Sequence, residues 1–250
     1  MDAVKYMYLS ALGIFLYQSY HARRAVLNWP IILAAVSLHA FYYFELAGLS
    51  FLLFIALVST LVELVSLKTK FNFFGVTYSY DLTHKLFPSR LVLMGVYPLE
   101  VTAAWILLKY TSFFLVITLL LSFPASLIAK SVVTAVVLVS FDLLVDPIAV
   151  AWGAWKWKRR GMFFGIPWQN FLGWFAVGLI TSFFAPHISP LHPVDLVAFF
   201  PITIVVISVV FGMGRKLFSR NPLQGTLAFL PLSAFFLLSV LNLLGRYPVN

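Results

Sequence analysis

Long apolar stretches, separated by short clusters of charge or proline, run through the whole 250-residue chain. A helix needs roughly 20 apolar residues to cross a bilayer, and eight stretches approach or exceed that length. They cover about 3–20, 30–47, 49–67, 90–121, 124–152, 169–185, 195–213 and 224–244. The pattern predicts an all-α, polytopic membrane helix bundle of about eight transmembrane helices, with seven as the alternative count.

Composition supports the same class of protein. Hydrophobic residues make up 62% of the chain and charged residues 10%, and the mean hydropathy is +0.98. A water-soluble domain of this length does not need so large an apolar fraction. We see no internal repeat and no soluble segment that divides the chain, so we expect a single integral-membrane domain over residues 1–250.

The basic residues predict the orientation. The formal net charge is +9, and most of the seventeen basic residues fall in alternate loops, near residues 23–24, 68–90, 156–160 and 215–220. Basic loops stay on the cytoplasmic side of a membrane. We therefore expect a multi-pass protein of the cell membrane with both termini outside. Because these residues border apolar spans, the charge indicates a lipid bilayer and not a nucleic acid as the partner.

Two acids inside an apolar span are the main clue to function. Asp142 and Asp146 are four residues apart, which places them on one face of a helix. An acid within a bilayer segment is costly and usually faces a cavity, a partner or a substrate. The predicted topology places Glu63, Glu100 and Asn170 in the same cytoplasmic half of the membrane. We therefore expect a polar pocket between helices.

Some of these acids have a structural alternative. Asp146 precedes Pro147, so its side chain could satisfy backbone groups that the proline leaves free. Glu63 could pair with Lys68 or Lys70 at the membrane surface. Both alternatives remain open from the sequence alone.

Aromatic residues fall into two groups. Trp152, Trp155 and Trp157 lie beside basic residues and are typical of an interfacial aromatic belt, and the segment 68–89 suits a position in the cytoplasmic interface. Trp174, one turn inside the next span, is a better candidate for the pocket.

Two blocks of residues form recognisable motifs. One block comprises Asp142-Leu143, Asp146-Pro147, Ala149, Gly153, Trp155, Trp157, Gly165-Ile166-Pro167, Asn170-Phe171 and Gly173-Trp174; the other comprises Glu63, Thr69, Phe74-Gly75, Tyr78, Tyr80, Pro98 and Trp105. Together they resemble a known family, the integral-membrane carotenoid hydratases, and the resemblance covers roughly residues 60–178. The resemblance implies a carotenoid substrate and the addition of water to the terminal C=C bond of an acyclic end group, giving a tertiary alcohol. It implies no cofactor and no metal.

This chemistry suggests a role for each residue. Hydration needs a proton donor, a stabilised tertiary carbocation and a water molecule directed at that carbon. We expect Asp142 to be the donor and Asp146 its partner or base, with the two roles exchangeable. Asn170 or Glu63 would orient the water. The predicted substrate-binding residues are Tyr80 and Trp174, whose rings would stabilise the cation, together with Glu100, Tyr78 and Phe74.

Two other functions remain open. A membrane lycopene cyclase also begins by protonating a polyene end, and Pro98-Leu99-Glu100 resembles an element of that family, although Val101 stands where a second acid would be expected. A transporter or non-catalytic subunit of a carotenoid complex is the alternative outside enzymes. Analysis of the product would distinguish all three.

Overall fold

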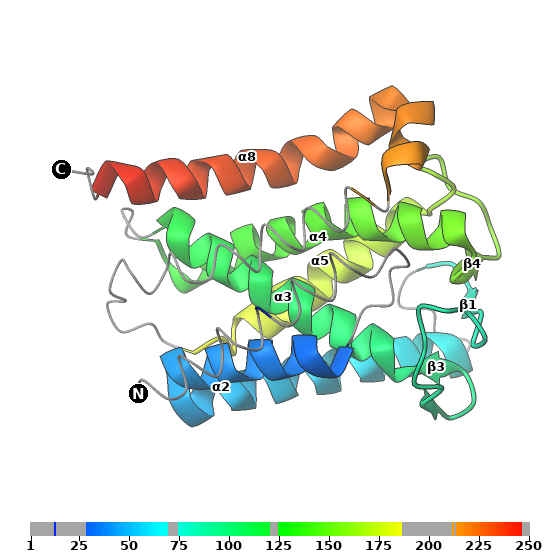
Figure 1. Cartoon of the computed structure of the whole chain (residues 1–250), viewed down its shortest axis with the longest axis horizontal. Coiled ribbons are helices and arrows are strands. Elements are labelled where there is room, and N and C mark those ends of the chain that lie inside the picture. The colour runs from blue at the N-terminus through cyan, green and yellow to red at the C-terminus, as the bar shows by residue number, and fades with distance from the viewer. Residues whose placement is uncertain are drawn as a thin grey trace.

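The computed structural model describes Gly13, residues 29–69, 75–120, 125–186, Gly212 and residues 214–246. In this part of the chain, long helices lie side by side and short strands gather at one end of the bundle (Figure 1). The helices are α2 (Trp29–Lys68), α3 (Leu99–Leu120), α4 (Leu127–Trp152), α5 (Trp168–Ser182) and α8 (Pro222–Arg246). The strands are β1 (Tyr78–Tyr80), β2 (Val92–Leu93), β3 (Tyr97–Pro98) and β4 (Trp155–Trp157).

The predicted count of eight membrane helices is wrong for the structure as described. Within the described residues, four helices are long and apolar enough to cross a membrane: α2, α3, α4 and the part of α8 up to Asn242. The predicted spans 3–20 and 195–213 lie almost entirely outside the described residues. Helix α5 has 15 residues, or about 22 Å at the usual rise, which is shorter than the hydrocarbon core of a bilayer.

Helix α2 consists of two arms that meet at a sharp break. Glu45 has φ 52° and ψ −135°, far from helical values. Trp29 and Glu63 line the same cavity, although a straight helix would place them about 51 Å apart, so the second arm must return along the first. A Cβ atom at Gly48 would lie 2.2 Å from the Ala40 carbonyl oxygen, so the close approach of the two arms requires glycine there.

Both arms of α2 pack against α3. The Thr60 and Thr102 hydroxyls lie 2.6 Å apart, and His39 Nδ1 lies 2.9 Å from the Tyr110 hydroxyl. These hydrogen bonds join polar groups of the two helices within an apolar core. Helix α3 therefore lies against both arms, which positions its Trp105 face beside Glu63.

Helices α4 and α5 form the tightest helix pair. Ser126 caps α4 by accepting the Ala129 N–H at 3.2 Å, and Gly153 ends that helix in a left-handed conformation. Helix α5 begins after Pro167 and returns along α4, where a Cβ atom at Gly178 would lie 3.0 Å from the Ala135 Cα atom. This approach faces α5 toward the two aspartates of α4.

The strands correct the all-α prediction, because the fold is mostly helical with two small antiparallel sheets. One joins β1 to β4, pairing Tyr78 with Trp157 and Tyr80 with Trp155; the other joins β2 to β3. Side chains alternate along a strand, so the β1 tyrosines and β4 tryptophans share one face, whereas Ser79 and Lys156 are exposed. Residues 78–80 thus form a paired strand, and the position of their segment at the membrane interface stays a prediction.

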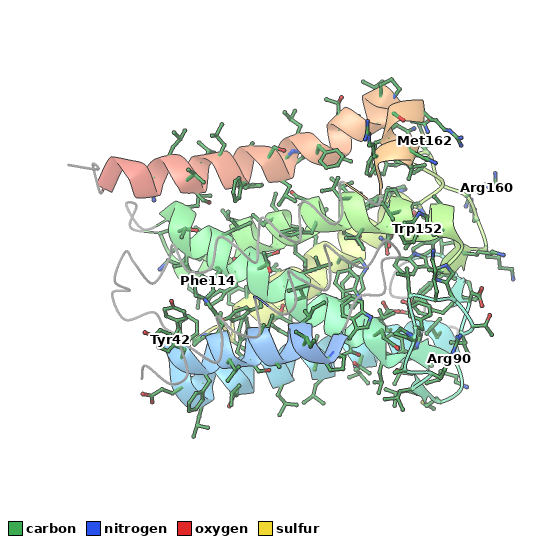
Figure 2. All side chains as sticks on the ribbon, in the orientation of Figure 1. Tyr42, Arg90, Phe114, Trp152, Arg160 and Met162 are labelled. Carbon is green, nitrogen blue, oxygen red and sulfur yellow. The ribbon has the colours of Figure 1, made fainter. Side chains whose placement is uncertain are left out.

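The end of the bundle that carries the strands also carries basic residues. Arg90 and Arg160 lie at this end, whereas Tyr42 lies at the opposite end (Figure 2). The segment leading into α8 reaches the same end (Figure 1) and contains Arg215, Lys216 and Arg220. Three of the four predicted basic loops therefore lie together; the fourth, near residues 23–24, is outside the described residues.

Candidate functional site

Asp142 and Asp146 lie one turn apart on α4, and both are buried, with exposed fractions of 0% and 4%. The side-chain amide of Asn170, near the start of α5, joins them. Its Nδ2 atom donates to Asp142 Oδ2 at 2.9 Å and to Asp146 Oδ2 at 2.7 Å. The Trp155 side chain also hydrogen-bonds Asp146. The close packing of α4 on α5 thus brings together three of the residues singled out from the sequence.

The second oxygen of Asp142 differs from the others in this cluster. Oδ1 is buried and has no hydrogen-bond partner among the described residues. A buried polar atom without a partner is unusual and requires an explanation. A carboxyl oxygen that carries a proton for transfer to an apolar substrate would have no protein partner before that substrate binds.

Glu63, from the second arm of α2, has three donors around its carboxyl group. Its Oε2 accepts the hydroxyl protons of Tyr78 and of Tyr80, the latter at 2.9 Å. Its Oε1 accepts the Trp105 indole N–H at 3.4 Å. Glu63 therefore pairs with aromatic donors rather than with Lys68, and the interfacial ion pair considered from the sequence is not needed to explain its position.

The two tyrosines act as donors to Glu63. Burial, together with the neighbouring Glu63 side chain, raises the pKa of the Tyr78 and Tyr80 phenols far above the ordinary tyrosine value. Both phenols therefore keep their protons at physiological pH. Three donors directed at one carboxyl group hold Glu63 in a fixed position at the edge of the cavity.

All these groups line one cavity, together with aromatic and aliphatic side chains. The Trp105 and Trp174 rings stack at its wall, with centroids 3.2 Å apart and an interplanar angle of 26°. Trp155 and Trp157 line the cavity as well, a position that the sequence predicts only for Trp174 among the tryptophans; their position in an interfacial belt stays a prediction. The pairing of β4 with β1, which turns these indoles inward, is not visible in a three-residue pattern. Among the described residues, the lining comprises Trp29, Ile32, Glu63, Tyr78, Tyr80, Leu86, Phe87, Glu100, Val101, Ala104, Trp105, Leu107, Leu108, Asp142, Val145, Asp146, Ile148, Ala149, Trp155, Trp157, Asn170 and Trp174.

Glu100 lines this cavity from the first turn of α3. Its Oε1 accepts the Ser89 backbone N–H at 2.8 Å, and its Oε2 is buried without a partner in the described part of the chain. Of the other predicted site residues, Tyr78, Tyr80 and Trp174 also line the cavity, whereas Phe74 lies outside the described residues. Its neighbour Gly75 has φ +70°, and a Cβ atom there would lie 2.8 Å from Gln169, so this segment passes directly beside the start of α5.

One intramembrane basic residue was missed from the sequence. Lys109 on α3 is 2% exposed, and its Nζ donates to the Gly178 carbonyl and to Ser182 Oγ, each at 2.5 Å. These acceptors belong to the last turns of α5, where a donor or cation is favourable. Lys109 therefore secures the end of α5 one turn beyond the Trp105–Trp174 stack. The position of Lys109 within an apolar span is the feature of the sequence that could have identified it.

Within the described residues, no group of three or more His, Asp or Glu side chains is arranged to hold a metal ion. The arrangement is an apolar, aromatic cavity lined by four acids, two of which are bridged by an amide. It can transfer a proton to an apolar molecule and stabilise the positive charge that results.

Comparison with known proteins identifies a matching family and a similar protein. Residues 26–235 match the family described as carotenoid biosynthesis protein. The bisanhydrobacterioruberin hydratase of Haloarcula japonica is 32% identical over 135 residues, which cover 54% of this chain and 43% of that protein. No solved structure matches the chain. Because the family match extends over most of the sequence, the chain belongs to the carotenoid biosynthesis protein family.

Proposed function

We propose that this protein adds water to the terminal C=C bond of an acyclic carotenoid end group and forms a tertiary alcohol. The observation that carries the proposal is the buried Oδ1 of Asp142, which has no hydrogen-bond partner among the described residues and lies in an aromatic cavity shared with three further acids. Membership of the carotenoid biosynthesis family and the name of the hydratase from Haloarcula japonica support the substrate class and the reaction.

The first step is protonation of the alkene. The Asp142 carboxyl group gives its proton to the alkene carbon that carries one hydrogen, and the π electrons form the new C–H bond. The positive charge then lies on the carbon that carries two methyl groups. Asp142 suits the donor role because burial away from water favours the protonated form of a carboxyl group, and the Asn170 amide occupies only its other oxygen.

The second step is capture of the cation by water. The stacked Trp105 and Trp174 rings present an aromatic wall that attracts a cation, and the Glu63 carboxylate, which accepts the Trp105 indole N–H, supplies negative charge beside that wall. The oxygen of a water molecule bonds to the tertiary carbon, and the released proton passes to a carboxylate, for which we favour Asp146. The net change is the addition of one water molecule, and no cofactor takes part.

The proposal also covers placement in the cell membrane. The basic end of the bundle, with Arg90 and Arg160, would face the cytoplasm, and the acid cavity would lie in the adjacent half of the bilayer. A carotenoid would then lie along the apolar part of the membrane with one end group in the cavity. Both chain termini would be outside.

Product analysis tests the proposed reaction. In cells that accumulate lycopene or a related carotenoid with acyclic ends, the protein should form a more polar product, heavier by the mass of one water molecule per reacted end. The absorption spectrum should be almost unchanged, because the hydrated alkene lies outside the conjugated chain. A product of unchanged mass with a shifted spectrum would indicate cyclisation, and the absence of any new compound would favour a transporter or non-catalytic subunit.

A further inference from the structure

Hydration requires a water molecule inside a cavity that is otherwise apolar, and the residues first considered for holding it are occupied. Both oxygens of Glu63 accept hydrogen bonds, from Tyr78, Tyr80 and Trp105. The Asn170 amide nitrogen donates to both aspartates. These hydrogen bonds tie both groups to protein partners within the described residues.

Glu100 has the geometry that these residues lack. In the described part of the chain, two carboxyl oxygens are buried without a partner, Asp142 Oδ1 and Glu100 Oε2, and both residues line the same cavity. An ordered water in a protein interior needs at least two polar partners. One of the two oxygens serves the proton donor, which leaves Glu100 Oε2 as an acceptor for water. The indole N–H of Trp157, which also lines the cavity and is buried without a partner among the described residues, is available as the second polar partner.

Glu100 also lies next to a solvent-exposed loop. Its Oε1 is held by the backbone N–H of Ser89, an exposed residue, whereas its Oε2 is buried. The loop around Ser89 belongs to the basic end of the bundle, where Arg90 projects outward (Figure 2). The carboxyl group thus lies between a solvent-exposed loop and the cavity, with one oxygen directed to each.

We propose that Glu100 is the water-binding site of the cavity: it receives water from the Ser89 side and holds it for attack on the tertiary cation. The inference rests on the proposed hydratase function and adds a residue and a role to it. Without the held water, the cation loses a proton again and returns to an alkene, so Glu100 decides between hydration and simple exchange of hydrogen.

The test separates protonation from water capture. Purified protein and an acyclic-ended carotenoid are incubated in deuterated water, and the hydrated and unhydrated carotenoids are both analysed by mass. In Glu100→Leu, hydration should fall at least about tenfold, while deuterium should still enter the unhydrated carotenoid, because Asp142 continues to protonate the alkene. Glu100→Gln, which keeps a hydrogen-bonding group, should show an intermediate loss of hydration.

Asp81→Asn provides the matched control, because Asp81 is an exposed acid that does not line the cavity; this variant should hydrate like the unchanged protein. Normal hydration in Glu100→Leu would overturn the inference. Loss of hydration and of deuterium incorporation together, in both Glu100 variants, would also overturn it, because protonation should not depend on Glu100. Failure of the unchanged protein to hydrate any carotenoid would overturn the proposed function itself, and the inference with it.

Discussion

At the scale of single residues, the account depends most on Asp142. In Asp142→Asn, the side chain keeps its shape and can still bond to Asn170, but an amide cannot deliver a proton of useful acidity. Positioned general acids contribute about 10²–10⁴-fold to a rate, so we expect hydration to fall at least about a hundredfold while the amount of protein in the membrane stays unchanged. The measurement is the rate of hydrated-carotenoid formation per amount of membrane protein. Normal turnover in both Asp142→Asn and Asp146→Asn would make the pair structural.

A second prediction concerns the donors around Glu63. Hydrogen bonds to a charged group contribute about 1.5–3 kcal/mol, so Tyr78→Phe should lower turnover by roughly ten- to a hundredfold if Glu63 acts as a fixed carboxylate. Because Tyr78 would act through Glu63, the double variant Tyr78→Phe with Glu63→Gln should be no slower than Glu63→Gln alone. Kinetics of the four proteins at saturating carotenoid provide the test. Strictly multiplicative losses would mean that the two residues act separately.

At the scale of elements, the break in α2 brings Glu63 and Trp29 to one cavity. Gly48→Ala would place a Cβ atom 2.2 Å from the Ala40 carbonyl oxygen. Overpacking of this kind lowers the free energy of unfolding by about 1–3 kcal/mol, which should appear as a lower thermal midpoint in detergent. Gly212→Ala is the control, because nothing lies within 4 Å of a Cβ atom there. Equal midpoints for the two variants would contradict the described contact between the arms.

The elements also show what the sequence could and could not predict. The spacing of Asp142 and Asp146 predicts a shared helix face because it depends only on helix geometry, and the structure places Asn170 against that face. The pairing of Tyr78–Tyr80 with Trp155–Trp157 was not predicted. Three alternating residues beside basic loops look the same in an interfacial belt, and the partner strand is distant in sequence.

At the scale of the whole molecule, the number of spans was the weakest prediction. Apolar length identifies stretches that tolerate lipid, but it does not distinguish two arms joined at Glu45 from two separate helices, nor α5 from a full span. Arg90 and Arg160 lie at one end of the bundle (Figure 2) because the chain reverses direction between them. Three of the four predicted basic loops lie at this end, as the prediction that basic loops alternate along the chain requires.

The orientation of the molecule can be measured directly, because the chain contains no cysteine. We expect Arg159→Cys, at an exposed position of the basic end, to be protected from an impermeant thiol reagent in intact cells and labelled after lysis. Ser189→Cys, outside the described residues, should be labelled in intact cells. A cysteine at nearby Gly161 would be unsuitable, because its Cβ atom would collide with the Ile166 carbonyl oxygen. The reverse labelling pattern would place the acid cavity near the other surface of the membrane.

The most direct test of the central claim is the source of the new oxygen atom. Purified protein is incubated with an acyclic-ended carotenoid in isotopically labelled water, without added cofactor, and Asp142→Asn serves as the inactive comparison. We predict one labelled oxygen atom for each reacted end in the product of the unchanged protein, and no product from the variant. A cyclised isomer without labelled oxygen, or a hydroxyl group whose oxygen does not come from water, would contradict the account.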